Sequence, residues 1–418
     1  MDLLGVRRVA HNFLAAVVLF PTASTVGKLC QKHLKLALIT GFFLSGVICG
    51  PNGLNFLKDE ALKDLAVVEK VCLAMIGISA GSEVNLKELR NVGKQIMVLV
   101  ISLCVATWAI VFASTLVLLP KTALAATVSL DKLPVLSSLT ATIMLARSPA
   151  SAIAVLKELE ARGPFATLSL AVIIVKDVLV IVLFSINLGV ARLFFHRDGD
   201  NALIGFIETL FKINVAAALG VFGAYLQKKV FSLKLGDNAH HQHVVRCCTL
   251  VLTAALLFSA SEALGSEPLL AALILGVTKA NLEGNTTKAD FISTVHYLMP
   301  NTYLIFFALA GASVHIDTLP SFFQSAFFVY SARLLSLYAG TKIGSKLGNC
   351  SKEHREIGWM AYVTQAGIAM GLSKSVLLQF PEWAGPFYTF LVCVILMNQI
   401  TGPTMYKAAL TTLGETNH

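Results

Sequence analysis

A basic and an acidic residue stand side by side at the centre of one long apolar segment. Thirteen uncharged residues precede Lys176 and Asp177, and fourteen uncharged residues follow them. A charge at the centre of a membrane-spanning helix costs at least about 2.5–3.5 kcal/mol, so it is retained only beside a polar cavity or a partner. Adjacent helical residues do not face each other, so these two charges do not simply neutralise one another. The position favours Asp177 as part of an ion pathway, and a structural ion pair between helices is the alternative.

A second apolar segment, LTATIMLARSPASAIAVLKE, holds Arg147, Ser148 and Pro149 near its middle. Proline has no backbone donor, so carbonyls about one turn earlier lose their partner. A broken helix at membrane depth is tolerated only beside protein or a water-filled cavity, and the ends of such half-helices can hold ions. An ordinary proline kink is the alternative. Arg147 favours the broken helix because a guanidinium stays charged and needs acceptors.

Two further segments carry polar residues at membrane depth. Arg333 lies about a dozen residues from either end of its segment, too far to reach water, so we expect an internal partner. In WMAYVTQAGIAMGLS, Thr364 and Gln365 precede Gly367 and Gly371, where a helix could unwind. Close helix packing through the small residues is the alternative reading of this stretch.

The elements that carry these residues are apolar helices. Of the 418 residues, 56% are hydrophobic and 14% are charged, whereas soluble domains carry about 25% charged residues. A period-2 pattern typical of a membrane β-barrel is absent, so we predict an all-α integral membrane protein with segments of about 20 residues. The sequence contains thirteen of them: 11–28, 36–52, 62–82, 93–120, 134–157, 163–191, 202–230, 244–263, 267–281, 294–314, 320–347, 355–379 and 385–410.

The basic residues of the loops predict the orientation. With thirteen spans, nine Lys and Arg fall on one side of the membrane and nineteen on the other. Cytoplasmic loops carry the excess, so we expect the N-terminus outside and the C-terminus inside. Arg7 and Arg8 precede the first segment without a small-residue cleavage site, which favours a retained helix. The net charge of +9 is therefore a topology signal and no indication of nucleic-acid binding.

Other chemistry has little support in the sequence. There is no GxxxxGK[ST] stretch for an ATP-driven pump, and no HExxH or nucleophile–base set for an enzyme, and we expect no cofactor. One stretch has the composition of a zinc site but no standard spacing, so a solvated loop is the favoured interpretation: Asp237, His240, His241, His243, Cys247 and Cys248. Glu69 and Lys70 could each pair with a residue of another helix.

Taken in order, these motifs resemble the second branch of the monovalent cation/proton antiporter superfamily, which contains many sodium/hydrogen and potassium/hydrogen exchangers. GFFLSGVICGPNGLNFL and LAMIGISAGSEVNLKELR are similar to its second and third helices, and ARSPASAIAVLKELEARGPF to its broken fifth helix. SEALGSEPLLAALILGV is similar to the turn between its eighth and ninth helices. Asp177 stands at the family's ion-site position, and Arg333 at a position that is basic in members.

The resemblance implies one transmembrane domain, 1–418, built as two inverted repeats, 11–191 and 244–410, with 202–230 as the linker helix. The broken fifth and twelfth helices would cross beside Asp177. Spans 4–6 and 11–13 would form a moving core, and spans 1–3 and 8–10 a panel that is expected to form a homodimer. Transport of Na⁺ or K⁺ against H⁺ would follow alternating access.

The predicted site has two groups of residues. The expected ion-binding residues are Asp177, Lys176, Ser148 and Thr364, and those expected to break a helix or compensate charge are Arg147, Pro149, Arg333, Gln365 and Gly367. Lys176 and Ser148 depart from the family, which usually has an acidic or uncharged residue before the key aspartate and often an aspartate before the proline.

Three cations around one carboxylate repel a metal cation unless a proton leaves. A transporter of an anion or organic acid, or a paralogue that does not transport, is therefore the alternative.

Overall fold

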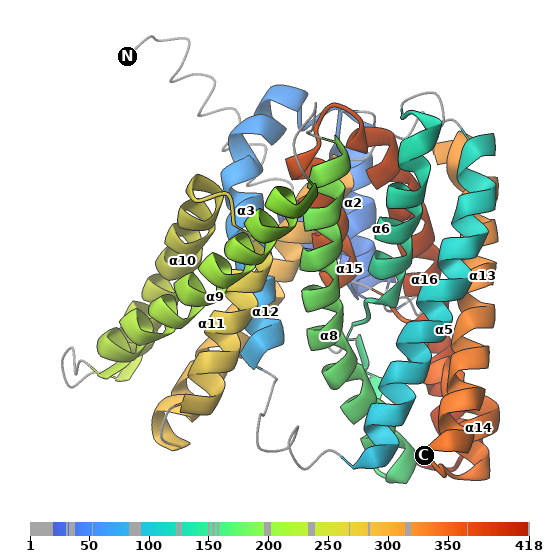
Figure 1. Ribbon diagram of the computed structural model, residues 1–418. Coiled ribbons are helices and arrows are strands. Elements are labelled where there is room, and N and C mark those ends of the chain that lie inside the picture. Colours follow the sequence, from blue (N-terminus) through green and yellow to red (C-terminus); the bar gives the residue numbers. More distant parts are fainter. Residues whose placement is uncertain are drawn as a thin grey trace.

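The computed structural model describes residues 20–30, 32, 38–51, 53–82, 93–122, 124, 128–148, 151–152, 155–156, 159–195, 202–232, 239–266, 268–282, 285–313, 319–365 and 367–416. Within these ranges every regular element is a helix (Figure 1). The longer ones are α2 (Leu38–Cys49), α3 (Asp59–Ser82), α5 (Lys94–Leu118), α6 (Leu133–Leu145), α8 (Pro164–Phe195), α9 (Ala202–Ser232), α10 (Ala239–Ala263), α11 (Pro268–Leu282), α12 (Asn285–Ala312), α13 (Leu319–Leu347), α15 (Gly367–Gln379) and α16 (Ala384–Thr412). Short helices are η1 (Leu119–Lys121), η3 (Leu130–Lys132), α14 (Lys352–Ile357) and η5 (Gly358–Tyr362).

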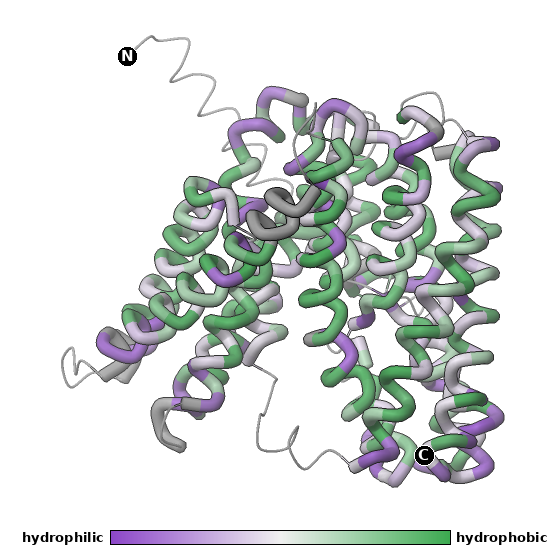
Figure 2. The backbone as a smooth tube through the Cα atoms, viewed as in Figure 1, coloured by the Kyte–Doolittle hydropathy of each residue, from purple (hydrophilic) through white to green (hydrophobic). Residues whose placement is uncertain are grey.

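The helices have the length and polarity of membrane spans. Among the described residues, six are long and apolar enough to cross a bilayer: Glu60–Ser82, Lys94–Lys121, Pro164–Phe195, Leu210–Lys229, Gln242–Ala263 and Ala384–Thr412. Hydrophobic residues make up most of the length of these helices, and many of the hydrophilic residues lie near their ends (Figure 2). Large apolar side chains also point outward, for example Val105 and Phe222, each about 60% exposed. Such a surface suits lipid, and the chain is a multi-pass integral membrane protein.

Helices from the two halves of the chain pair closely. α2 packs on α12, α3 on α11, and α5 on α13. In the first pair, a side chain on Gly46 would meet the backbone of Ala308, and one on Gly311 the backbone of Phe43. Glycine at these positions therefore lets the two backbones approach closely, as small residues do in membrane helix pairs.

Two predicted spans are broken, as expected. The fifth stops at Leu145, the last residue of α6, and the chain leaves the helical conformation at Ala146, where ψ is 153°. Pro149 lies outside the described residues. The twelfth span consists of α14, η5 and α15, and residues 363–365, which follow η5, are non-helical; Ala366 lies outside the described residues.

Two helices start earlier than hydropathy predicts. α10 begins at Ala239 rather than 244, and α12 at Asn285 rather than 294. The added turns are polar, and Asp290 in the added part of α12 forms an ion pair of 2.9 Å with Arg246 of α10, between Arg246 Nη2 and Asp290 Oδ2. Hydropathy detects only the part of a helix that lies in lipid, so it misses turns that continue into water.

Glu415, near the end of the chain, caps the first turn of α8. The Glu415 carboxylate accepts hydrogen bonds from the backbone amides of Phe165 and Ala166, at 2.9 and 2.8 Å. These amides belong to the first turn, which has no partner within its own helix. A negative charge also suits the positive end of the helix dipole. The helix that carries Asp177 is thereby fixed at its first turn.

Candidate ion-binding site

The site lies where α8 passes the broken end of α6. The backbone N–H of Arg147 donates a hydrogen bond of 3.1 Å to Asp177 Oδ1. Lys176, Arg147 and Arg333 are each 0% exposed, and Asp177 is 3% exposed. Three basic side chains and one acidic side chain are therefore buried inside the helix bundle, as the sequence predicted for residues that need internal partners.

The carbonyl end of α6 is satisfied by side chains from distant helices. Arg333 Nε donates to Met144 O at 2.9 Å, and Gln365 Nε2 donates to Ile143 O and Ala146 O, each at 3.2 Å. The last carbonyls of a helix lack partners in their own helix and carry partial negative charge. An arginine and an amide donor therefore stabilise the break in the fifth span.

The second break is bound by two arginines, Arg333 again and Arg147. Arg333 Nη1 donates to Val363 O at 2.7 Å, and Arg147 Nη1 donates to Ala361 O at 3.2 Å. The Arg147 guanidinium also lies 4.7 Å from the centre of the Tyr362 ring, a cation–π distance. Arg147 and Arg333 thus join the two broken spans to each other.

Sequence reasoning missed Asn398. This residue of α16 accepts a 2.6 Å hydrogen bond from Arg333 Nη1 and donates a 3.1 Å bond to Gln365 Oε1. It carries no charge, so a search for charges at membrane depth passes over it. The usable signal is an amide within an apolar span, LVCVILMNQITGP, because a buried amide must find hydrogen-bond partners.

Three other predicted site residues, Ser148, Thr364 and Gly367, also lie at the breaks, and each has different contacts. The Ser148 hydroxyl is 2.9 Å from Ser151 Oγ and accepts from Ser151 N at 3.2 Å, so its hydrogen bonds among the described residues stay on its own segment. Thr364 is buried with its backbone against Gly402 of α16. A Cβ on Gly367 would lie 3.4 Å from the Tyr303 ring, so this glycine begins α15 in close contact with α12.

Several charged atoms of the cluster make no hydrogen bond to any described residue. They are Lys176 Nζ, Asp177 Oδ2, Arg147 Nε, Arg147 Nη2 and Arg333 Nη2. Leaving a buried polar group unpaired costs about 1–3 kcal/mol, and more for a charge. Asp177 Oδ2 is therefore available to a cation, a proton or water, whereas the arginine nitrogens can only donate, to water or to an anion.

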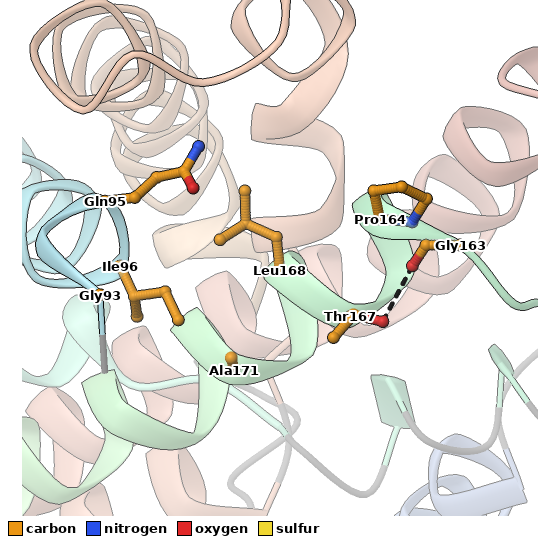
Figure 3. A pocket seen from close by; sticks show the side chains of 8 residues that line it. All are labelled: Gly93, Gln95, Ile96, Gly163, Pro164, Thr167, Leu168 and Ala171. Carbon is orange, nitrogen blue, oxygen red and sulfur yellow. Dashed lines mark hydrogen bonds between the residues drawn. The ribbon is translucent and has the colours of Figure 1, made fainter. Parts of the chain in front are cut away.

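A pocket of about 530 Å³ lies elsewhere, between the starts of α5 and α8. Its lining is largely apolar, with Gln95 and Thr167 as the polar side chains, and Thr167 Oγ1 is bonded to Gly163 O (Figure 3). The lining includes no charged residue, so the pocket is separate from the cluster around Asp177.

No metal site is seen in the part of the chain that is described. No group of three or more His, Cys, Asp or Glu that could hold a metal occurs there. The His and Cys residues of the predicted loop, from His240 to Cys248, lie on the first turns of α10. Asp237 lies outside the described residues.

Solved structures share this fold. The sodium proton antiporter MjNhaP1 from Methanocaldococcus jannaschii, at pH 8, superposes with a TM-score of 0.71 over 98% of this chain and 99% of that chain, at 18% identity. An electron-microscopy structure of MjNhaP1 gives a TM-score of 0.65 over 100% of both chains, at 19% identity. A search of curated proteins found no match. The helices of this chain therefore have the fold of this antiporter.

The sequence itself identifies the family. The model of the transmembrane sodium/hydrogen exchanger family matches residues 18–411, nearly the whole chain and all the residues of the site. The proteins of this family and its structural neighbours are transporters, which agrees with the lack of catalytic motifs. The chain belongs to the sodium/hydrogen exchanger family.

Proposed function

We propose that the chain exchanges a monovalent cation, Na⁺ or K⁺, for H⁺ by alternating access, with Asp177 as the group that binds each in turn. The observation that carries this proposal is one carboxylate, buried where two broken spans meet, with one oxygen held and the other free. Arg147 N fixes Oδ1, and Oδ2 has no hydrogen-bond partner among the described residues.

Antiport follows from competition for this carboxylate. A bare carboxylate in a low-dielectric interior is unfavourable. The site would therefore change the side of the membrane to which it opens only when Asp177 holds either a cation or a proton. Ser148, Thr364 and the carbonyls at the breaks would supply further oxygen ligands, which hard cations prefer. Uptake of radiolabelled Na⁺ or Rb⁺ into vesicles with an acidic interior tests this directly. Uptake that does not depend on the proton gradient would contradict it.

The helix pairs support the two inverted repeats, 11–191 and 244–410, with 202–230 as the linker. Exchanging the repeats maps the second span onto the ninth and the third onto the tenth. The pair α2–α12 then becomes the pair α11–α3, and α5–α13 becomes itself, which are pairs found in the structure. In this scheme α5, α6, α8, α13, α15 and α16 form the moving core, and α2, α3, α10, α11 and α12 form the panel that makes a homodimer.

One buried ion pair spans the proposed boundary between core and panel. Lys374 Nζ on α15 lies 3.0 Å from Glu69 Oε1 on α3, and both side chains are under 10% exposed. Alternating access would have to separate this pair. Glu69→Gln should lower the free energy of unfolding by about 3–5 kcal/mol, because it leaves a buried ammonium unpaired. The variant with both Glu69→Lys and Lys374→Glu should recover much of the stability and the exchange rate.

The adjacent residue provides a matched control. Lys70 pairs with Glu262 at 2.7 Å, but these side chains are 29% and 43% exposed and both lie on the panel. Lys70→Gln should change stability by less than about 1 kcal/mol and leave exchange unaltered. Melting temperatures and vesicle exchange rates measure both variants. Equal, small effects at Glu69 and Lys70 would contradict the proposed boundary.

The orientation is tested by labelling. We expect the N-terminus outside and the loop from Leu226 to Val244 inside, from the nine-to-nineteen division of basic residues. In a Cys248→Ser background, which removes the exposed native cysteine, Asn238→Cys should resist a membrane-impermeant thiol reagent on intact cells, and Asp200→Cys should react. The opposite pattern would invert the topology. Both engineered positions lie outside the described residues.

A second candidate function rests on the excess of buried positive charge. Arg147, Lys176 and Arg333 surround a single carboxylate, and each has a buried donor without a hydrogen-bond partner among the described residues. An anion or organic acid would satisfy such donors. In this case vesicle pH would respond to a gradient of that anion and not to Na⁺ or K⁺.

A further inference from the structure

α16 carries two adjacent buried amide side chains, one with several hydrogen bonds and the other with none to a described residue. Asn398 is 0% exposed, accepts from Arg333 Nη1 at 2.6 Å, and donates to Gln365 Oε1 at 3.1 Å and to Val394 O at 2.7 Å. Gln399 is 1% exposed, and neither of its amide atoms has a hydrogen-bond partner among the described residues. The first amide is therefore held in one place by its neighbours, and the second serves as a comparison within the same turn.

The orientation of the Asn398 amide is dictated by Arg333. A guanidinium only donates, so the Asn398 oxygen must face it and the Asn398 NH₂ must face Gln365. Gln365 must then present its oxygen to Asn398. Its own NH₂ is thereby directed at the carbonyls of Ile143 and Ala146, each 3.2 Å away.

The last bond of this series reaches Asp177. The carbonyl of Ala146 and the N–H of Arg147 belong to the same peptide group, which is planar. The carbonyl accepts from Gln365 while the N–H donates to Asp177 Oδ1 at 3.1 Å. A hydrogen bond that fixes the carbonyl of this peptide group therefore also fixes the direction of its N–H. Arg333, Asn398, Gln365 and this peptide group thus form one ordered series of hydrogen bonds that ends at the carboxylate.

We propose that Asn398 is a positioning residue for the ion site, acting through Gln365 to hold the peptide group between Ala146 and Arg147 with its N–H on Asp177. The inference rests on the proposed role of Asp177 in exchange. An N–H donated to a carboxylate favours the ionised form, so loosening this peptide group makes Asp177 hold its proton more tightly. Cation binding, which needs the ionised form, then weakens.

The test compares Asn398→Leu with the control Gln399→Leu. In Asn398→Leu the apparent KM for the cation should rise about tenfold, the effect expected when a hydrogen bond to a charged group is lost. Half-maximal exchange should move to higher pH. In Gln399→Leu both properties should stay as in the wild type. An effect confined to the amount of folded protein, with the wild-type pH profile in Asn398→Leu, would overturn the proposal.

Asn398→Asp separates orientation from packing. The new carboxylate keeps the shape and still accepts from Arg333, but it has no NH₂ to present to Gln365. We expect Asn398→Asp to shift the pH profile of exchange in the same direction as Asn398→Leu, although aspartate has nearly the same size and shape as asparagine. A wild-type profile in Asn398→Asp would overturn it.

A cycle of melting temperatures tests the same series without transport. If Asn398 and Gln365 act in one series, the loss of stability in the double variant Asn398→Leu with Gln365→Leu should be clearly smaller than the sum of the losses in the two single variants. Additive losses would overturn the inference. If wild-type vesicles show no exchange, the proposed function fails, and this cycle alone decides whether Asn398 orients the break.

Discussion

Asp177→Asn is expected to lower cation-driven proton movement by about a thousandfold, which in vesicles is complete loss. The amide keeps an oxygen for the 3.1 Å bond from Arg147 N, so the side chain can stay in place. It carries no charge and does not exchange a proton. A carboxylate and a cation about 4 Å apart attract by about 4 kcal/mol at an effective dielectric of 20, and each 1.4 kcal/mol is a factor of ten.

The measurement is vesicle exchange at matched protein content, with melting temperature as the test of folding. Asp290→Asn is the control, since this residue is 43% exposed at the side chain and pairs with Arg246 at the start of α12. We expect it to exchange at the wild-type rate. Wild-type exchange in Asp177→Asn would remove this residue from the mechanism and leave its burial without a functional reason.

Lys176→Gln is expected to change the number of protons exchanged for each cation. If the Lys176 ammonium stayed charged, a cation about 4 Å away would be repelled by about 4 kcal/mol at an effective dielectric of 20. Cation binding then requires the ammonium to release its proton, and Lys176 Nζ has no hydrogen-bond partner among the described residues that would hold the charged form. Without this second proton carrier, exchange loses one proton per cation and depends less steeply on pH.

The competing role for Lys176 is a fixed structural cation. In this case Lys176→Gln would lower stability or expression, and the protein that survives would keep the wild-type proton-to-cation ratio. Reversal potentials measured in vesicles at several pH values give the ratio directly. A wild-type ratio together with the wild-type pH dependence in Lys176→Gln would refute the carrier role.

The sequence predicts much of the site because charges in lipid are costly. Arg147, Asp177 and Arg333 stand out for this reason, and the structure buries all three at the two breaks. Pro149 and Gly367 predict the approximate positions of the breaks, since both residue types disturb a helix, and the structure ends α6 at Leu145 and begins α15 at Gly367. These predictions depend on local rules that act within one segment.

The partners of these residues depend on contacts between distant segments. Arg333 binds Met144 O, which is 189 residues away in the chain. No local pattern specifies this carbonyl. Asn398 is neutral, so its role appears only when the hydrogen bonds on both sides are known. The Ser148 hydroxyl is predicted to face the ion, and its hydrogen bonds to Ser151 form along its own segment, a contact that no hydropathy pattern specifies.

Asp177 is proposed to bind a monovalent cation and a proton in turn. Purified protein in vesicles that contain a pH-sensitive dye tests it most directly, with Na⁺, K⁺ and Li⁺ added outside in turn. We expect at least one of these cations to drive protons out of the vesicles in the wild type, and none to do so in Asp177→Asn. Proton movement that is the same in both proteins, or that no cation elicits in the wild type, would contradict the account.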